Sequence, residues 1–154
     1  MYTYNYPRAA LTVDAIVFVK ERIPSLPDKN IKDGILEKTY VLLIERSREP
    51  FKNKWALPGG FIEMDETLET ACKRELLEET GLNVDKMTQF KTYDAIDRDP
   101  RHRTISVVYY TQLDKKHAVT GGDDASRAEW FSVSELPELA FDHEQILDEF
   151  FAFL

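Results

Sequence analysis

Residues 60–82 read GFIEMDETLETACKRELLEETGL, and this stretch predicts a turn, a helix and a helix stop in that order. From about residue 66 to residue 80 the residue types are strong helix formers, chiefly Leu, Glu, Ala, Lys and Arg. Gly81 then occupies the position where a residue in the left-handed conformation commonly ends a helix. The chain is therefore expected to have one central helix, entered from a glycine-rich turn.

Three carboxylates gather on one face of the predicted helix. Glu75, Glu78 and Glu79 fall within about 100° of arc, because successive helical residues are rotated by about 100°. They lie near the helix end where the dipole disfavours negative charge, so a cation beside them is favourable. Hard oxygen ligands at this density suit Mg²⁺ or Mn²⁺. The alternative is a solvated acidic face, which is the usual fate of a glutamate-rich helix.

The spacing of these residues resembles the Nudix box, Gly-x5-Glu-x7-Arg-Glu-U-x-Glu-Glu-x-Gly-U, where U is a bulky aliphatic residue. Residues 60–82 match every fixed place of this pattern. Resemblance to the Nudix hydrolase family implies an α/β fold, the α/β/α sandwich with a mixed sheet between helices, with residues 1–154 as a single domain. It also implies metal-dependent hydrolysis of the diphosphate bond in a nucleoside-diphosphate derivative.

The resemblance also assigns roles within the box. The backbone carbonyl of Gly60 and the three glutamates of the helix face are implied to bind the metal. Glu66 and Arg74 are implied to form a structural pair that braces the loop onto the helix. The catalytic centre predicted in this way consists of Glu66, Arg74, Glu75, Glu78 and Glu79.

Composition and charge narrow the class of protein. The chain has 154 residues, of which 43% are hydrophobic and 31% charged, as expected for one globular domain. The net charge of −8 argues against nucleic acid as the main partner, since a nucleic-acid backbone requires a cationic surface. Cys72 is the single cysteine, so no disulfide framework can form within the chain. No signal peptide or membrane-spanning run is recognised, which makes the cytoplasm the expected location.

The rest of the chain predicts strands on both sides of the helix and a second helix near the end. Apolar and β-branched residues indicate strands at residues 9–20, 40–46, 89–95, 103–112 and 128–132. Residues 21–38, with two prolines and an Asp-Gly pair, are expected to form an exposed loop or a loose hairpin. Residues 55–60 are expected to form a turn, and residues 141–154 an amphipathic helix.

Segments outside the box resemble bacterial and archaeal ADP-ribose pyrophosphatases. They are residues 44–61, 97–106, 122–131 and 139–143. The resemblance implies Mg²⁺-dependent conversion of ADP-ribose into AMP and ribose 5-phosphate. His102 stands where these relatives often have glycine, and its larger side chain would alter the substrate edge of the site.

Arginines and aromatic residues are the predicted substrate contacts. Arg98, Arg101 and Arg103 crowd one loop of an acidic chain, and a guanidinium fork suits a phosphate. The alternative for this loop is a solvated basic turn beside Asp97 and Asp99. Aromatic rings before the glycine turn are candidates either for stacking on adenine or for the core. The full set of predicted substrate contacts is Arg46, Phe51, Trp55, Arg98, Arg101 and Arg103.

Two further positions have both a catalytic and a structural interpretation. Asp123 or Asp124, which follow a Gly-Gly pair, would supply a catalytic base or simply form a turn. His143 is expected to be structural, because a lone histidine at the start of a helix is more often structural than catalytic.

Three functions remain open at the level of sequence. The first is an ADP-ribose pyrophosphatase, and the second is a Nudix hydrolase for a nucleoside triphosphate or another nucleotide sugar. The third is the ligand-sensing Nudix domain of a transcription regulator. The intact box glutamates argue against the third, as does the lack of room for a winged helix before Leu154. A homodimer is also expected, because ADP-ribose enzymes of this type commonly pair.

Overall fold

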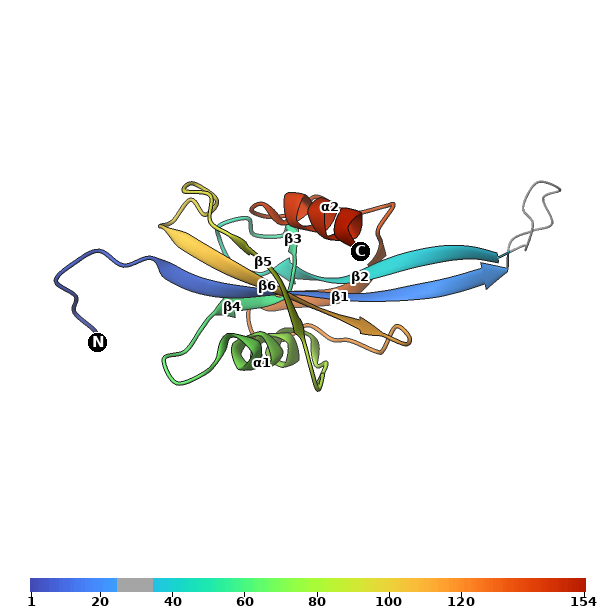
Figure 1. Ribbon diagram of the computed structural model, residues 1–154, viewed down its shortest axis with the longest axis horizontal. Coiled ribbons are helices and arrows are strands. Elements are labelled where there is room, and N and C mark those ends of the chain that lie inside the picture. The colour runs from blue at the N-terminus through green and yellow to red at the C-terminus, as the bar shows by residue number, and fades with distance from the viewer. Residues whose placement is uncertain (25–34) are drawn as a thin grey trace.

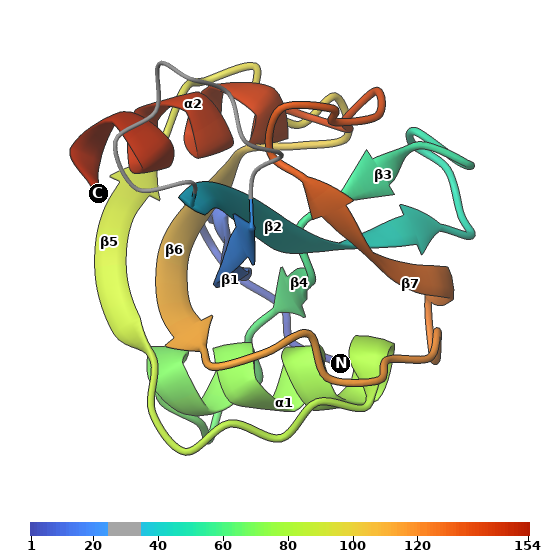
Figure 2. The same ribbon diagram turned by 90° about the vertical axis from the view of Figure 1, so that its right-hand side faces the viewer.

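The structure is a computed structural model that describes residues 1–24 and 35–154. Within these ranges, seven strands form one mixed sheet and two helices lie against it (Figure 1, Figure 2). The elements are β1 (Ala10–Pro24), β2 (Ile35–Arg46), β3 (Trp55–Ala56), β4 (Gly59–Phe61), α1 (Leu68–Thr80), β5 (Thr88–Tyr93), β6 (Thr104–Leu113), β7 (Ala125–Ser132) and α2 (His143–Phe153). The predicted fold class, an α/β sandwich with a mixed sheet between helices, is confirmed.

Strand β1 lies at the centre of the sheet. One of its edges runs parallel to β6, which in turn pairs antiparallel with β5. Its other edge pairs antiparallel first with β4, where Asp14 lies opposite Gly59, and then with β2, where Phe18 lies opposite Val41. Strand β2 continues past β1 to pair with β7 and β3. This edge of β1 therefore pairs with β4 at residues 12–14 and with β2 from Phe18 onward, and the glycine turn lies where the first partner gives way to the second.

Both faces of the sheet are covered, because α1 packs on one face and α2 on the other (Figure 1). Side chains alternate along a strand, so Val13 and Val17 lie in the cluster that contains Leu76 of α1. Phe18 points the other way and lies in the cluster that contains Phe150 of α2. This double burial explains why the central strands read as continuous apolar runs. It also fixes their register, since a slip of one residue would exchange the two faces.

Hydrogen bonds define both the start and the end of helix α1. At its start, the Thr67 side chain accepts a hydrogen bond from the Thr70 N–H at 3.2 Å. At its end, Gly81 has a left-handed φ of 77°, and its N–H donates to the Leu77 carbonyl at 2.9 Å. The predicted helix and its glycine stop are confirmed. The helix begins two residues later than predicted, because the threonine cap satisfies one of the first free N–H groups.

Helix α2 begins at His143 rather than at residue 141 as predicted. Phe141 has a left-handed φ of 52°, a conformation that no helix can contain. The apolar side that the sequence predicted is buried, with Ile146, Leu147 and Phe150 at 1% exposure or less. Neither described helix is long and apolar enough to cross a membrane.

The strands differ from prediction at the β1–β2 hairpin and at the glycine turn. Strand β1 continues to Pro24 and β2 begins at Ile35, so both ends of the segment 21–38, for which the sequence predicts a loop or a loose hairpin, are strands. Residues 25–34 lie outside the described ranges. Residues 55–60 include the short strands β3 and β4 as well as a turn. Such short strands are formed by pairing with β2 and β1, and intrinsic preference alone does not predict them.

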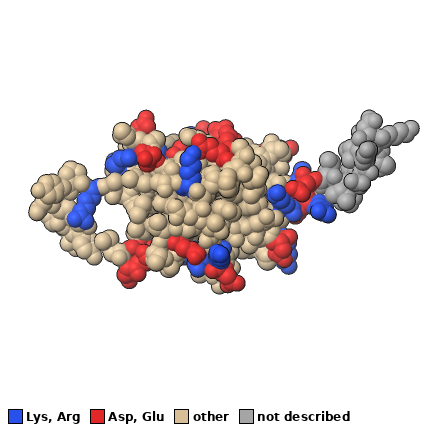
Figure 3. Space-filling view, in the orientation of Figure 1, with Lys and Arg blue, Asp and Glu red and all other residues tan. Residues whose placement is uncertain are grey.

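Charged side chains are scattered over the molecular face shown in Figure 3. Basic and acidic groups lie together there and form no continuous band of one sign.

Substitution of Gly81 by alanine should lower the free energy of unfolding by about 1 kcal/mol, because a Cβ strains the left-handed conformation. The nearest atom that the new Cβ would meet is Thr120 Oγ1 at 3.6 Å, an ordinary contact, so the backbone strain acts alone. Gly81→Asn is the control and should cost less, since asparagine tolerates this conformation better. Urea unfolding measures both variants. Equal losses of unfolding free energy in Gly81→Ala and Gly81→Asn would argue against backbone strain as the cause.

Candidate active site

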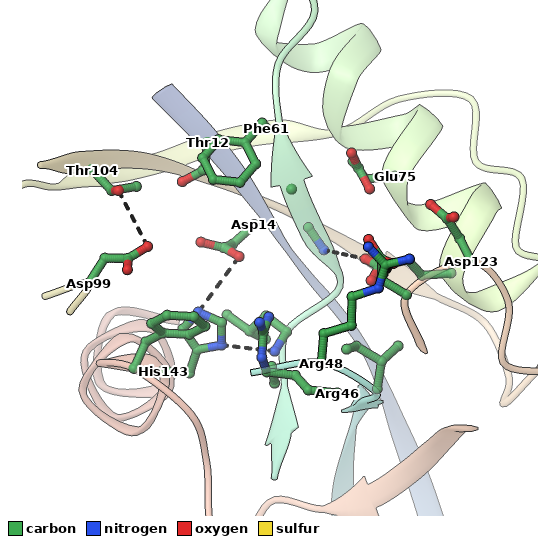
Figure 4. A pocket seen from close by; sticks show the side chains of 18 of the residues that line it. Thr12, Asp14, Arg46, Arg48, Phe61, Glu75, Asp99, Thr104, Asp123 and His143 are labelled. Carbon is green, nitrogen blue, oxygen red and sulfur yellow. Dashed lines mark hydrogen bonds and ion pairs between the residues drawn. The ribbon is translucent and has the colours of Figure 1, made fainter. Parts of the chain in front are cut away.

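A cleft of about 610 Å³ opens beside the glycine turn (Figure 4). Its walls come from β1, β2, β4, the C-terminal half of α1, the loops at residues 98–104 and 123–124, and the residues at the start of α2. The predicted site residues that line it are Arg46, Gly60, Arg74, Glu75, Glu78, Glu79, Arg98 and Arg101. Those that do not line it are Phe51, Trp55, Glu66 and Arg103. The fold thus brings the box and the arginine-rich segments to one cleft.

Arg74 ties the loop before α1 to the helix. Its Nε and Nη2 atoms donate to the two carboxylate oxygens of Glu66 at 3.0 and 2.7 Å, and Nη2 also donates to the Phe61 carbonyl at 3.2 Å. Its Nη1 donates to Glu75 at 3.0 Å and to Glu78 at 3.2 Å. The predicted pairing of Glu66 with Arg74 is confirmed. The same guanidinium also neutralises part of the acidic face.

The three glutamates of the acidic face lie along one wall of the cleft. Arg74 holds Glu75 and Glu78, whereas Glu79 Oε1 accepts a hydrogen bond from the Gly59 N–H at 2.7 Å. Among the residues that the structure describes, no three His, Cys, Asp or Glu side chains are grouped as a ready-made metal site. Binding of a metal by all three glutamates therefore requires Glu75 and Glu78 to turn from Arg74 toward a shared point.

Negative charge is unfavourable at this wall. Burial raises the pKa of Glu79 to about 9, although the hydrogen bond from Gly59 acts in the opposite direction. Burial also raises the pKa of Glu75, against the effect of Arg74, and the neighbouring Glu78 adds to the increase. A cation placed among these carboxylates would favour their ionised forms.

The donors at this wall fit a divalent cation. They are hard oxygens, from three carboxylates and from the backbone carbonyl of Gly60. A Cβ at Gly60 would lie 2.5 Å from Glu75 Oε1, so a side chain there would push the Glu75 carboxylate aside. In this structure the carboxylate packs directly on the turn backbone.

The arginines of the 98–104 loop are already paired within the protein. Arg98 is buried and forms two hydrogen bonds with Asp142, at 2.9 and 2.7 Å. Arg101 forms a similar fork with Asp99, at 3.1 and 2.8 Å. Arg103 donates to two backbone carbonyls earlier in the same loop. The loop is thus cross-braced rather than a solvated turn, and only its first two arginines reach the cleft.

Arg46 differs from the other arginines of the cleft. Its Nε donates to the Pro50 carbonyl at 2.8 Å, and its guanidinium lies 4.9 Å from the centroid of the Phe141 ring. In the described part of the chain it has no ion-pair partner, whereas every other cleft arginine pairs with a carboxylate. Burial and the nearby Arg101 lower the pKa of Arg46. An anionic ligand would therefore find Arg46 available without breaking an internal ion pair.

The aromatic surface of the cleft is not the one that the sequence predicted. Trp55 is only 9% exposed and belongs to the apolar cluster beside α2. Phe51 packs edge-on against Phe141, with ring centroids 4.8 Å apart. Phe141 and Phe61 themselves line the cleft, and the Arg101 guanidinium lies 5.8 and 5.4 Å from their ring centroids. Phe51 thus does not line the cleft itself but packs against Phe141, which does.

The loop before β7 also reaches the cleft. A Cβ on Gly122 would lie 2.6 Å from a backbone oxygen of α1, so the loop packs closely on the end of that helix. Asp124 pairs with Arg48 at 3.1 Å, and Asp123 has a left-handed φ of 53°. Asp123 faces the cleft from the same side as Glu75 (Figure 4).

Besides Phe61 and Phe141, sequence reasoning missed the carboxylate of Asp14 and the ring of His143 as its partner in the cleft wall (Figure 4). Asp14 accepts a hydrogen bond from the Ser106 hydroxyl at 2.5 Å, and His143 Nδ1 accepts one from the Leu57 N–H at 3.0 Å. A single acid inside the apolar run of β1 was an available signal for Asp14. The contact of His143 with Leu57 is made only by folding and has no local signal.

Comparison with known proteins identifies the family to which this fold and site belong. The sequence profile of the NUDIX domain matches residues 34–152. The chain is 46% identical to the ADP-ribose pyrophosphatase of Methanocaldococcus jannaschii over 119 residues, which cover 77% of this chain and 70% of that protein. The chain belongs to the Nudix family.

Other relatives share the NUDIX fold in different contexts. The chain is 32% identical over 152 residues to the ADPR responsive transcriptional repressor NtrR of Acinetobacter baylyi, covering 96% of this chain and 55% of the repressor. The NUDIX domain of Shewanella oneidensis NrtR, solved with ADP ribose, matches with a TM-score of 0.79 at 29% identity, over 96% of this chain and 90% of that one. The bifunctional NMN adenylyltransferase/ADP ribose pyrophosphatase of Francisella tularensis, solved with AMP and a Mn ion, matches with a TM-score of 0.78 at 30% identity, over 97% of this chain and 43% of that one.

Protein treated with a chelator should lose stability as the pH rises. The pKa of Glu79 in the folded state, about 9, exceeds its ordinary value of 4.5, so the folded state binds this proton more tightly. The stability that this proton contributes is fully present at pH values below the ordinary pKa of 4.5, and it is lost as the pH rises through the pKa of the folded state, about 9. Glu79→Gln removes the titration and should flatten the dependence of the thermal midpoint on pH. If the thermal midpoints of wild type and Glu79→Gln change with pH in the same way between pH 4.5 and about 9, the raised pKa of Glu79 is contradicted.

Proposed function

We propose that this Nudix diphosphate hydrolase cleaves ADP-ribose into AMP and ribose 5-phosphate. The observation that carries the proposal is the cleft itself, in which an intact acidic face meets a wall of arginine and aromatic side chains. ADP-ribose presents the matching chemistry, a diphosphate joined to a flat base at one end and a sugar at the other. The 46% identity to an ADP-ribose pyrophosphatase and the ADP-ribose complex of a structural relative support this choice of substrate.

We assign the metal-binding role to the Gly60 carbonyl and to the carboxylates of Glu75, Glu78 and Glu79, with Mg²⁺ as the proposed ion. A divalent ion held there would screen the charge of the diphosphate and lower the pKa of a bound water. The Mn ion in the structure of the Francisella tularensis relative supports a divalent cation. Arg74 could keep its bidentate pair with Glu66 when the glutamates bind the ion, so the wall would keep its shape.

Arg46 is proposed as the principal phosphate contact, because it reaches the cleft without a carboxylate partner among the described residues. Phe61 and Phe141 are proposed as the stacking surface for adenine, since both rings line the same cleft. Arg101 lies over both rings while Asp99 holds its fork, which leaves it to shape the aromatic wall. In this arrangement the base and the diphosphate are bound by adjacent side chains.

Ligand sensing within a transcription regulator is the second candidate function. The similarity to a transcriptional repressor along 96% of the chain favours it. The intact acidic face and its Arg74 brace favour the enzyme, because a sensor that does not hydrolyse its ligand has no need of them. The mixed charges on the face in Figure 3 also offer no continuous basic band for a nucleic-acid backbone. Turnover of ADP-ribose decides between the two.

Three other expectations accompany the proposal. A single domain over residues 1–154 is supported by the inclusion of all described strands in one sheet. A cytoplasmic location is in keeping with Cys72, which is buried and unpaired. A homodimer is in keeping with the exposed tyrosines near the N-terminus, Tyr2 and Tyr6, at 71% and 81% exposure.

A phosphatase-coupled screen with Mg²⁺ should show rapid turnover of ADP-ribose, ahead of other nucleotide sugars, dinucleotides and nucleoside triphosphates. Glu79→Gln should lower kcat about 100-fold or more, because the neutral amide is a poor metal ligand. Glu69→Gln is the matched control, since Glu69 lies on the same helix but does not line the cleft. A Glu79→Gln variant with normal kcat would sink the assignment of the metal site. Binding of ADP-ribose by the wild type without turnover would favour the sensor.

Replacement of Arg46 by alanine should raise KM for ADP-ribose about tenfold and change kcat less, as expected for a contact present in both ground and transition states. Arg127→Ala is the control, because Arg127 is an exposed arginine that pairs with Glu45 outside the cleft. Steady-state kinetics on the three proteins measure the difference. Equal KM values for both variants would remove Arg46 from the substrate site.

A further inference from the structure

Two buried polar side chains of the cleft wall have no part in the contacts proposed above. Asp14 is 7% exposed and His143 is 4% exposed. His143 Nε2 lies 3.6 Å from Asp14 Oδ1, and its Nδ1 accepts the Leu57 N–H at 3.0 Å. The other Asp14 oxygen accepts the Ser106 hydroxyl at 2.5 Å. A chain of polar contacts therefore runs from β6 through β1 to α2, and from there to the backbone of the glycine turn. Figure 4 shows its central contact, between Asp14 and His143.

These contacts fix which ring nitrogen of His143 carries the proton. The Leu57 N–H can only donate, so Nδ1 has to be the unprotonated acceptor. The neutral ring therefore carries its hydrogen on Nε2, which faces the carboxylate of Asp14. Burial of the ring lowers the pKa of His143, in keeping with a neutral imidazole.

The contact with Leu57 holds one end of the turn that leads into the box. Besides the pairing of β4 with β1, three hydrogen bonds hold this turn: from the Leu57 N–H to His143, from the backbone of β1 to the Pro58 carbonyl at 2.8 Å, and from the Gly59 N–H to Glu79 at 2.7 Å. The first and the third depend on side chains outside the sheet. The position of the turn thus depends on the His143 ring as well as on strand pairing.

Asp14 also touches the turn directly. It lies opposite Gly59 in the pairing of β1 with β4, and a Cβ on Gly59 would lie 2.6 Å from Asp14 Oδ1. A shift of Asp14 or His143 therefore displaces the backbone that presents the Gly60 carbonyl. It also displaces the N–H group that orients Glu79.

The start of α2 is anchored independently of this ring. Asp142 forms the bidentate pair with Arg98, at 2.9 and 2.7 Å. Phe141, in its left-handed conformation, packs on Phe51. Because Asp142 and Phe141 are held by these contacts, the position of His143 does not depend on the turn. Its ring is therefore a fixed hydrogen-bond acceptor that positions the turn.

We propose that His143 and Asp14 are positioning residues that set the turn of residues 57–60, and through it the Gly60 carbonyl and the Glu79 carboxylate. The Leu57 N–H fixes the tautomer of the ring, the carboxylate of Asp14 faces the Nε2–H and favours its orientation, and the ring holds the turn. The inference rests on the proposed hydrolysis of ADP-ribose, because it adds these two residues to the same site.

Matched variants separate positioning from simple stability. His143→Gln keeps a donor near Nε2 but has no acceptor for the Leu57 N–H, whereas His143→Asn keeps an acceptor near Nδ1. Asp14→Asn is nearly isosteric, but it has one acceptor oxygen where the carboxylate has two and no negative charge, so the Ser106 hydroxyl and the Nε2–H can no longer each donate to an oxygen of their own. Tyr93→Phe is the control, because it removes the hydrogen bond at 2.5 Å from Tyr93 to Glu149 of α2, outside the cleft.

We expect His143→Gln and Asp14→Asn each to lower kcat for ADP-ribose about tenfold with a much smaller change in KM, since a misplaced turn weakens contacts in the transition state. His143→Asn should retain most of kcat. Tyr93→Phe should lower the thermal midpoint and leave kcat unchanged. In metal-free protein, the amide resonances of Gly59 and Gly60 should move in His143→Gln and Asp14→Asn and stay in place in the control.

Normal kcat together with unmoved Gly59 and Gly60 amides in His143→Gln and Asp14→Asn would overturn the inference. A loss of kcat shared by Tyr93→Phe would also overturn it, because it would reflect the docking of α2 in general. If wild-type protein does not hydrolyse ADP-ribose but the two amides move as expected, the proposed function fails and the positioning role stands.

Discussion

The close contact between β4 and β1 is the constraint on which the cleft depends. Gly59 stands at this contact because a Cβ there would collide with the backbone oxygen of Val13 in β1, and a Cβ on Gly60 would push the Glu75 carboxylate of α1 aside. The edge of β1 passes from β4 to β2 just beyond this point, so the turn backbone faces the cleft instead of continuing a strand. The acidic face of α1 and the start of α2 both meet that backbone, each through a hydrogen bond to one of its N–H groups.

Charge inside the cleft is balanced by internal pairs. Arg74 is shared among the glutamates of the box, while Arg98 and Arg101 are held by Asp142 and Asp99. These pairs brace the walls and leave little free positive charge for a diphosphate. A chain with a net charge of −8 therefore needs a further source of positive charge to bind an anionic substrate. In the proposed mechanism most of the added positive charge arrives with the metal, and Arg46 contributes the rest.

Features encoded within a few residues of one another were predictable, and contacts between distant segments were not. The helix of the box and its stop at Gly81 follow from neighbouring residues, as does the grouping of three glutamates on one face. The sequence favours Arg98 as a substrate cation, since its partner Asp142 lies 44 positions away and has no local signal. For Trp55 the sequence leaves stacking and core packing open, and the core position follows from the pairing of β3 with β2 and with Leu139. The role of His143 likewise depends on a backbone N–H from another part of the chain.

The parallel pairing of β1 with β6 has a consequence for how the chain is made. Ala10 pairs with Thr104, so the centre of the sheet joins segments that lie far apart in the sequence, and such non-local pairing slows folding. Until β6 has left the ribosome, β1 presents an open edge that other extended segments can join. His143 emerges later still. The acidic helix is therefore synthesised well before the parts of the cleft wall that the 98–104 loop and the start of α2 supply, and the cleft is complete only once these segments have joined it.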